Sequence, residues 1–354
     1  MLESLLALGR GLFVLAAGVI ALGITLWTFG AVYYDVGRGR RFALPAALTW
    51  VGAVVALFYF LQPLWLAMLV LLAVWAGFMA WWFSQKPSMD RDWDPNFVKL
   101  PRFDIDGQHV IVHNVRNTEY VSPTEFTPRF ETREYDLSKL RGVDGVIITW
   151  GSPWICHPML VFDFGDDGRL CISIEIRYRQ GQRFSFFPTL YRRQEIMYVV
   201  SDERDAMLKR IIHDPGHELY LYRLRASHDE DLKVFLEYVV STNKLADRPR
   251  WYHGLTSNCT TSIYRQRTRQ VEWDLRWLLN GRLDEMIYEH GRLDQRLPFE
   301  ELRRQSRITE LAKEAPPEGF GDFIRENLPG YRELESDEAL TPGRSTCNNT
   351  SDRS

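Results

Sequence analysis

Cys259 is the residue whose type and position most directly suggest chemistry. It lies in the polar stretch LTSNCTTSIYRQ, residues 255–266, where a helix is predicted to begin near Asn258. At a helix N-terminus, unpaired N–H groups and the helix dipole favour a thiolate and can bind a developing oxyanion. Cys259 is therefore a candidate nucleophile, with Asn258 as helix cap and the hydroxyl of Thr260 beside it. The plainer interpretation is that Cys259 is only a small residue at a helix start.

A base for this thiol is predicted by a β-hairpin pattern in residues 157–177, HPMLVFDFGDDGRLCISIEIR. The sequence DDG at its middle fits a three-residue loop, and pairing Leu160 with Ile174 then makes one face of the hairpin wholly apolar. His157 and Glu175 share the opposite face as diagonal neighbours, about 7–8 Å apart at the backbone. A carboxylate in that place would fix the tautomer and ring plane of a general base.

Other interpretations of these residues stay open at this point. His157 could be a strand histidine without chemistry, and Glu175 could pair with a surface arginine such as Arg177. His253, which precedes Cys259 by six residues, is a rival base, although it lies too close along an extended segment to reach back easily. The histidines of the segment HDPGH are expected in a loop. The sequence has no C-x-x-C pair, and no histidines four residues apart are predicted on a helix, so no metal site is expected.

Charge is distributed very unevenly along the chain. The sequence has 354 residues and a formal net charge of -3, which gives no electrostatic reason to expect a nucleic-acid partner. Residues 1–83 hold few ionisable side chains apart from tyrosines, namely Glu3, Arg10, Asp35, Arg38, Arg40 and Arg41. From Ser84 onward the chain is densely charged. A membrane part is therefore joined to a water-soluble part.

The membrane part, residues 1–83, predicts three transmembrane helices. Gly11–Tyr33, Phe42–Leu61 and Leu64–Trp82 are each roughly 20 apolar residues long, enough to cross about 30 Å of hydrocarbon. Three spans place the soluble part on the same side of the membrane as the loop that holds Arg38–Arg41. The positive-inside tendency would make that side cytoplasmic.

The soluble part predicts an α+β domain. A stalk, residues 84–101, leads to a domain at residues 102–330, and a polar tail, residues 331–354, is predicted to be disordered. The expected strands are His109–Val115, Gly145–Trp150, Pro158–Phe164, Leu170–Tyr178, Arg183–Phe187, Glu195–Val200 and Glu218–Leu224. The expected helices are Asp202–Ile212, Asp229–Ala246, Ser262–Gln270, Leu283–His290 and Leu302–Ala315.

Four segments, in this order, resemble the family of the Lnb N-terminal periplasmic domain, which is named after a lipoprotein N-acyltransferase. They are NVRNTEYVSPTEFTPRFETREYDLSKLRGVD, WGSPWICHPMLVFDFGDDGRLCISIEIR, YVVSDERD and LTSNCTTSIYR. The resemblance runs from about residue 92 to 330. His157 matches the strand histidine of that family, Glu175 the glutamate of its S-I-E-x-R strand, and Asn258 to Thr261 its N-C-T-T motif. Related sequences more often carry Asn at position 253, which weakens His253 as a base.

The resemblance implies a circularly permuted papain-like core with an antiparallel sheet and helices, preceded by transmembrane helices. It implies a Cys259–His157–Glu175 triad in an acyl-transfer enzyme, a hydrolase or an acyltransferase, with neither a metal nor a nucleotide cofactor. The expected substrate is an envelope lipid, lipoprotein or peptidoglycan amide. Lnb itself has a large membrane half after this domain, so its activity does not follow from the resemblance alone. The alternative is a non-catalytic envelope binding or accessory protein with the same fold.

The resemblance also reverses the expected orientation. Members with N-terminal spans before a DRDW stalk, here Asp90–Trp93, are multi-pass inner-membrane proteins with the domain in the periplasm. We therefore expect the soluble domain to be periplasmic, and the Arg38–Arg41 loop to depart from the positive-inside tendency.

Overall fold

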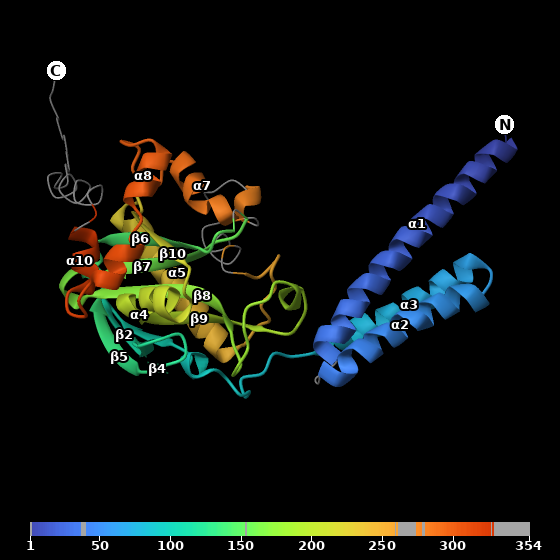
Figure 1. Cartoon of the computed structure of the whole chain (residues 1–354), viewed down its shortest axis with the longest axis horizontal. Helices are drawn as coiled ribbons and strands as arrows, with labels where there is room; N and C mark the ends of the chain where they lie inside the picture. The colour runs from blue at the N-terminus through green and yellow to red at the C-terminus, as the bar shows by residue number, and fades with distance from the viewer. Residues whose placement is uncertain are drawn as a thin grey trace, which may run out of the picture. The chain divides into compact units, whose positions relative to one another are not determined.

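Three long apolar helices begin the chain, as Figure 1 shows. They are α1 (Leu2–Ala31), which continues as a π-helical turn to Val36, α2 (Arg40–Phe60) and α3 (Leu64–Ser84). Within the described part of the chain, these three helices are long and apolar enough to cross a membrane. The predicted spans are confirmed as helices, with α1 beginning at Leu2 rather than at Gly11.

The computed structural model describes residues 2–36, 40–152, 154–258, 260, 274–277, 280–326 and 328. Within these residues the chain divides into two units. The first comprises Met1–Asp94, Ile176–Ile196 and Pro249–Asn258, and the second comprises Pro95–Glu175, Met197–Arg248 and Cys259–Ser354. Two segments of the soluble sequence therefore belong to the unit that holds the apolar helices. The expected helix at residues 262–270 and the expected disordered tail lie outside the described residues.

A mixed eight-stranded sheet forms the centre of the second unit. Its strand order is β1-β2-β9-β8-β7-β6-β10, and β5 also pairs with β2. The main strands are β1 (Arg102–Asp106), β2 (His109–Arg116), β5 (Phe130–Asp136), β6 (Gly142–Thr149), β7 (His157–Asp163), β8 (Arg169–Arg177), β9 (Glu195–Asp202) and β10 (Glu218–Arg223). A separate small sheet pairs β3 (Glu119–Tyr120) with β4 (Phe126–Thr127).

The expectation of an antiparallel sheet is wrong in one place. The strands β2 and β9 run parallel where Arg116 pairs with Ser201. Parallel neighbours need a long crossover connection, and the chain supplies one because β5 to β8 lie between these two strands in sequence. The prediction also missed β1 and β5, and placed a strand at Arg183–Phe187, where none forms.

The predicted hairpin is formed by β7 and β8, but its register differs by two residues. Leu160 pairs with Ile172 rather than with Ile174. The loop begins one residue earlier than expected, because Gly165 takes a positive φ and Phe164 N–H bonds to Gly168 O at 3.0 Å. A shift of two residues keeps every side chain on its predicted face.

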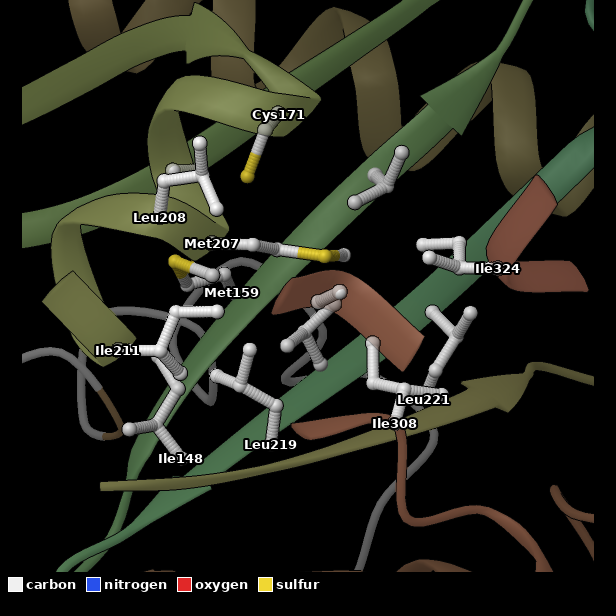
Figure 2. Close-up of a cluster of buried hydrophobic side chains, with 14 of the residues drawn as sticks. Ile148, Met159, Cys171, Met207, Leu208, Ile211, Leu219, Leu221, Ile308 and Ile324 are labelled. Atoms are coloured by element: carbon white, nitrogen blue, oxygen red, sulfur yellow. The ribbon is translucent and has the colours of Figure 1, made fainter. Parts of the chain in front are cut away.

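Both faces of this hairpin are buried. Phe162 and Phe164 pack on Phe235 of α5 (His228–Asp247), with ring centroids 5.1 and 5.2 Å apart. On the opposite face, Met159 and Cys171 join an apolar cluster that Figure 2 shows. The expected polar face is therefore an interior one, because β6 and β9 flank the hairpin and helices cover both sides.

The described helices complete this cover. They are α4 (Glu203–Leu208) with a π-helical turn at Lys209–His213, α5, α7 (Leu283–Glu289), α8 (Phe299–Gln305), α9 (Thr309–Glu314) and α10 (Phe320–Glu326). Ser227 caps α5 in a capping box with Glu230. The expected helix Leu302–Ala315 is divided in two, because the backbone of Ser306 and Ile308 bonds to strand β10.

Candidate functional site

The structure brings His157 and Glu175 together. His157 begins β7, and extending the observed register by two residues places it opposite Glu175 on β8. The distance from His157 Nε2 to Glu175 Oε1 is 3.8 Å, and their side chains are 13% and 5% exposed. This distance is too long for a hydrogen bond. Among the described residues, the buried Nε2 has no hydrogen-bond partner.

Glu175 makes its closest contacts with other side chains. Its Oε1 accepts hydrogen bonds from Arg210 Nη2 at 2.7 Å and from Ser173 Oγ at 2.8 Å. Lys209 Nζ lies 3.8 Å from its Oε2. The alternative of a surface pair with Arg177 is wrong, because Glu175 is buried and its arginine partner comes from the turn after α4. Glu175 therefore belongs to a buried charge cluster that touches His157.

The position of these two cations follows from the local sequence. Asp202 ends β9 and caps α4 by accepting a hydrogen bond from the backbone N–H of Arg204. The helix then returns along the sheet and widens into a π-helical turn at Lys209 and Arg210. Such turns often occur at functional sites. Both side chains reach Glu175 from this turn.

Burial and the two cations determine the protonation states at this site. Burial raises the pKa of Glu175, but Arg210 and then Lys209 hold that pKa well below its usual range, so the carboxylate is charged. Burial, followed by the charge of Arg210, lowers the pKa of His157 to about 3. Burial also lowers the pKa of Lys209 to about 8. At neutral pH His157 is therefore an uncharged imidazole next to an ionised carboxylate.

A second feature links the residue before His157 to the residue after Cys259. Asn280 accepts a hydrogen bond from Cys156 N at 2.9 Å, and its Nδ2 donates to Cys156 O at 3.0 Å. The same Nδ2 donates to Thr260 Oγ1 at 2.5 Å. Asn280 is 5% exposed, and sequence analysis did not identify it because it stands apart from every motif.

The predicted nucleophile, Cys259, lies outside the described residues. Of its two neighbours in sequence, Thr260 is buried and bonded to Asn280, whereas Asn258 donates from Nδ2 to Gly254 O at 2.6 Å. That bond holds Asn258 in the turn that precedes the predicted helix. A role for Asn258 or Thr260 as helix cap or in an oxyanion site stays a prediction.

The rival base His253 has a local structural role. Its Nδ1 accepts hydrogen bonds from the backbone N–H groups of Leu255 and Thr256, both at 3.3 Å. Burial lowers the pKa of His253 below its ordinary value, and a hydrogen bond with the Leu190 backbone offsets only part of this effect. One ring nitrogen of His253 is therefore occupied by its own turn.

The histidines of the HDPGH segment contact aromatic rings. His213 packs against Tyr120 and meets Phe126 edge-on, and His217 lies against Trp150. Within the part of the chain that the structure describes, no group of three histidine, cysteine or acidic side chains could hold a metal ion.

Comparison with known proteins finds a similarity to one family over part of the chain. Residues 126–276 match the family model described as the Lnb N-terminal periplasmic domain. The matched segment includes His157, Glu175 and Arg210 as well as Cys259. No curated protein and no solved structure matches the chain.

Proposed function

We propose that the chain is a membrane protein whose Lnb-type domain lies in the periplasm, and that this domain is a cysteine-dependent acyl-transfer enzyme. The family match over residues 126–276 and the three apolar helices support this proposal. Cys259 is the nucleophile, His157 the general base and Glu175 the carboxylate that tunes His157. The core is of the permuted papain-like type, and the protein is a multi-pass protein of the inner membrane.

One observation supports the pairing of Cys259 with His157 above all others. Asn280 joins Cys156 to Thr260, and these two residues are covalently bonded to His157 and Cys259. Two segments that are distant in sequence are thereby held together next to the two proposed reacting residues. The buried Nε2 of His157, which has no partner among the described residues, adds a second indication, because unpaired buried polar atoms often belong to functional sites.

The reaction follows from these roles. The thiol of Cys259 attacks an acyl carbonyl carbon while His157 takes the thiol proton. The tetrahedral intermediate collapses, His157 protonates the leaving alcohol or amine, and an acyl-thioester remains on Cys259. Water or an amine then attacks the thioester, and His157 again takes and returns one proton. Attack by water makes the enzyme a hydrolase, and attack by an amine makes it a transferase.

Glu175 acts in this scheme through its charge. At 3.8 Å it stabilises the imidazolium that forms during proton transfer, although Arg210 occupies its nearest oxygen. If the neutral imidazole carries its own proton on Nε2, which faces Glu175, then Nδ1 is the nitrogen that accepts the proton of the Cys259 thiol. Membrane anchoring favours a lipid, lipoprotein or peptidoglycan substrate, since each of these lies within reach of an anchored domain.

Thiol labelling of the full chain in detergent tests the proposal. We expect iodoacetamide at pH 7 to modify Cys259 much faster than Cys156 and Cys171, which are 3% and 0% exposed, as measured by peptide mass spectrometry. His157→Gln should slow labelling of Cys259 by about 10-fold or more, the lower part of the range for general-base catalysis. His253→Gln is the matched control and should change the rate little.

An acyl-donor panel tests the chemistry itself. Incubation with phospholipid, lipopeptide and peptidoglycan fragments should leave a hydroxylamine-sensitive acyl adduct on Cys259, and Cys259→Ser should abolish it. If His253→Gln has the effect expected of His157→Gln, the base assignment is wrong. If Cys259 labels no faster than the buried cysteines, the domain is better described as a binding module in which Glu175 and its cations are structural.

The orientation can be tested separately. Alkaline phosphatase fused after Leu100 should be active in cells, because that enzyme folds only in an oxidising compartment. An inactive fusion would show that the Arg38–Arg41 loop follows the positive-inside tendency.

A further inference from the structure

The segment between β8 and β9 combines exposed aromatic rings with positive charge. Residues 178–194, YRQGQRFSFFPTLYRRQ, contain four arginines and no aspartate or glutamate. Phe184, Phe186 and Phe187 are 51%, 45% and 65% exposed. We call residues 183–187, all of which are exposed, the phenylalanine loop. Three large apolar rings that are exposed within four residues of each other indicate an interaction surface.

The base of this loop packs on the ends of two membrane helices within the first unit. The ring of Tyr191 lies 6.1 Å from Trp27 and 5.3 Å from Tyr34, near the C-terminal end of α1. Arg192 stacks on Trp82 of α3 at 4.3 Å, and its guanidinium donates to Phe83 O at 2.9 Å. The loop is thus attached where the apolar helices end.

These two helix ends lie on one side of the membrane. With three spans, the C-terminal ends of α1 and α3 emerge on the same side, and the rings of Trp27 and Trp82 touch at 5.1 Å. Tryptophan and tyrosine at span ends mark the membrane–water interface. Phe187 is four residues from Tyr191, so it lies within about 14 Å of that interface. The interfacial layer itself is roughly 5–8 Å thick on each side.

We propose that the phenylalanine loop inserts into the membrane that holds the three spans. Its three rings enter the boundary between headgroups and acyl chains, and Arg183 contacts anionic headgroups. The occupant is the lipid bilayer, because the loop continues directly from residues packed on the span ends and carries only positive charge. Insertion removes three exposed aromatic rings from water at a position fixed by Tyr191 and Arg192.

Thr189, two residues after the phenylalanine loop, contacts the segment that leads to the proposed nucleophile. Gly254 N–H donates to Thr189 O at 2.9 Å, and Gly254 O accepts from Asn258 Nδ2 at 2.6 Å. A Cβ on residue 254 would lie only 2.4 Å from Thr189 Oγ1, so this contact requires glycine. If the proposed function holds, the substrate is an acyl lipid or acylated peptide embedded in the same leaflet.

Photocrosslinking in lipid nanodiscs tests the insertion. The full chain carries p-benzoylphenylalanine in place of Phe187, and a second sample carries it in place of Phe184. Both side chains are exposed, so folding should be unaffected. After irradiation we expect the modified peptide to gain the mass of one phospholipid. The matched control places the same probe at Val240, an apolar side chain of α5 that is 65% exposed, and should give little lipid adduct.

The outcomes are distinguishable. Lipid adducts at both loop positions and not at residue 240 support insertion. Absence of a lipid adduct at the loop, equal adducts at residue 240, or a protein adduct in native membranes would each overturn it. The measurement does not depend on Cys259, so it should give the same result in Cys259→Ala. A failed catalytic proposal and a failed insertion proposal are therefore separable.

Discussion

The buried, uncharged state of His157 predicts a specific loss of stability in mild acid. In the unfolded chain this imidazole titrates near 6.5, whereas in the fold its pKa is about 3. Between these values the unfolded state binds more protons, so the free energy of unfolding rises with pH and falls as the pH drops. At 1.36 kcal/mol per pH unit, His157 alone should remove about 2 kcal/mol between pH 7 and pH 5.

This window separates His157 from Glu175. The pKa of Glu175 is lowered in the fold, so its stabilisation is fully present above the unfolded value of 4.5 and is lost only below it. Between pH 7 and pH 5 the contribution of Glu175 to stability therefore stays nearly constant. His157→Gln removes the titrating group and keeps a side chain of similar size, so this variant should lose about 2 kcal/mol less than the parent over the same range.

Urea unfolding of the detergent-solubilised full chain provides the assay, followed by tryptophan fluorescence at each pH. Helices held in a micelle resist urea, so the transition reports the soluble part. His113→Gln is the control, because that side chain is 40% exposed and lies away from the charge cluster. If His157→Gln and the parent protein lose the same stability between pH 7 and pH 5, the pKa of His157 is the same in the folded and unfolded states, and the inference that burial and Arg210 lower it is refuted.

Three further changes give defined outcomes in the same unfolding assay. Arg210→Gln should cost about 3 kcal/mol at pH 7, since it breaks a buried ion pair, and should also reduce the loss in mild acid because the imidazole pKa rises. Asn280→Ala should cost about 2–3 kcal/mol by leaving buried backbone groups unpaired, and Asn280→Asp, which keeps only the acceptor, should not restore it. Gly254→Ala should destabilise through its clash with Thr189, and Thr189→Ala should restore part of the loss.

The sequence predicted the faces of the hairpin but not its register or its surroundings. Successive side chains of a strand alternate between its two faces, so Phe162 and Phe164 share one face and Met159 and Val161 the other. Shifting the pairing of the two strands by two residues leaves this assignment unchanged. The register depends on where the turn begins. Both Gly165 and Gly168 can take a positive φ, so the sequence allows a turn that begins at either Gly165 or Asp166. The burial of the supposedly polar face depended on β6, β9 and α4, which pack there through long-range contacts that no local pattern shows.

The same limit explains which site residues were found. His157 and Glu175 were recognised because a short hairpin carries both. Arg210 comes from a π-helical turn and Asn280 from a short 3-10 helix elsewhere in the chain, so only the fold places them. The strand predicted at Arg183–Phe187 failed for a related reason. Its aromatic residues have high β-propensity, but they are exposed in a loop and pair with no strand.

The charge cluster also constrains how the proposed catalysis can work. Among the described residues, His157 is buried next to the cations Arg210 and Lys209 and the anion Glu175, so a proton on its imidazole is disfavoured at rest. An anion next to His157 raises its pKa, as Glu175 does, and a thiolate would do so more strongly because it receives the charge when the proton leaves it. In the proposed mechanism the imidazole therefore takes its proton only as the thiolate forms. On this account Glu175 has two roles, because it stabilises the imidazolium and also holds Arg210 and Lys209 next to His157.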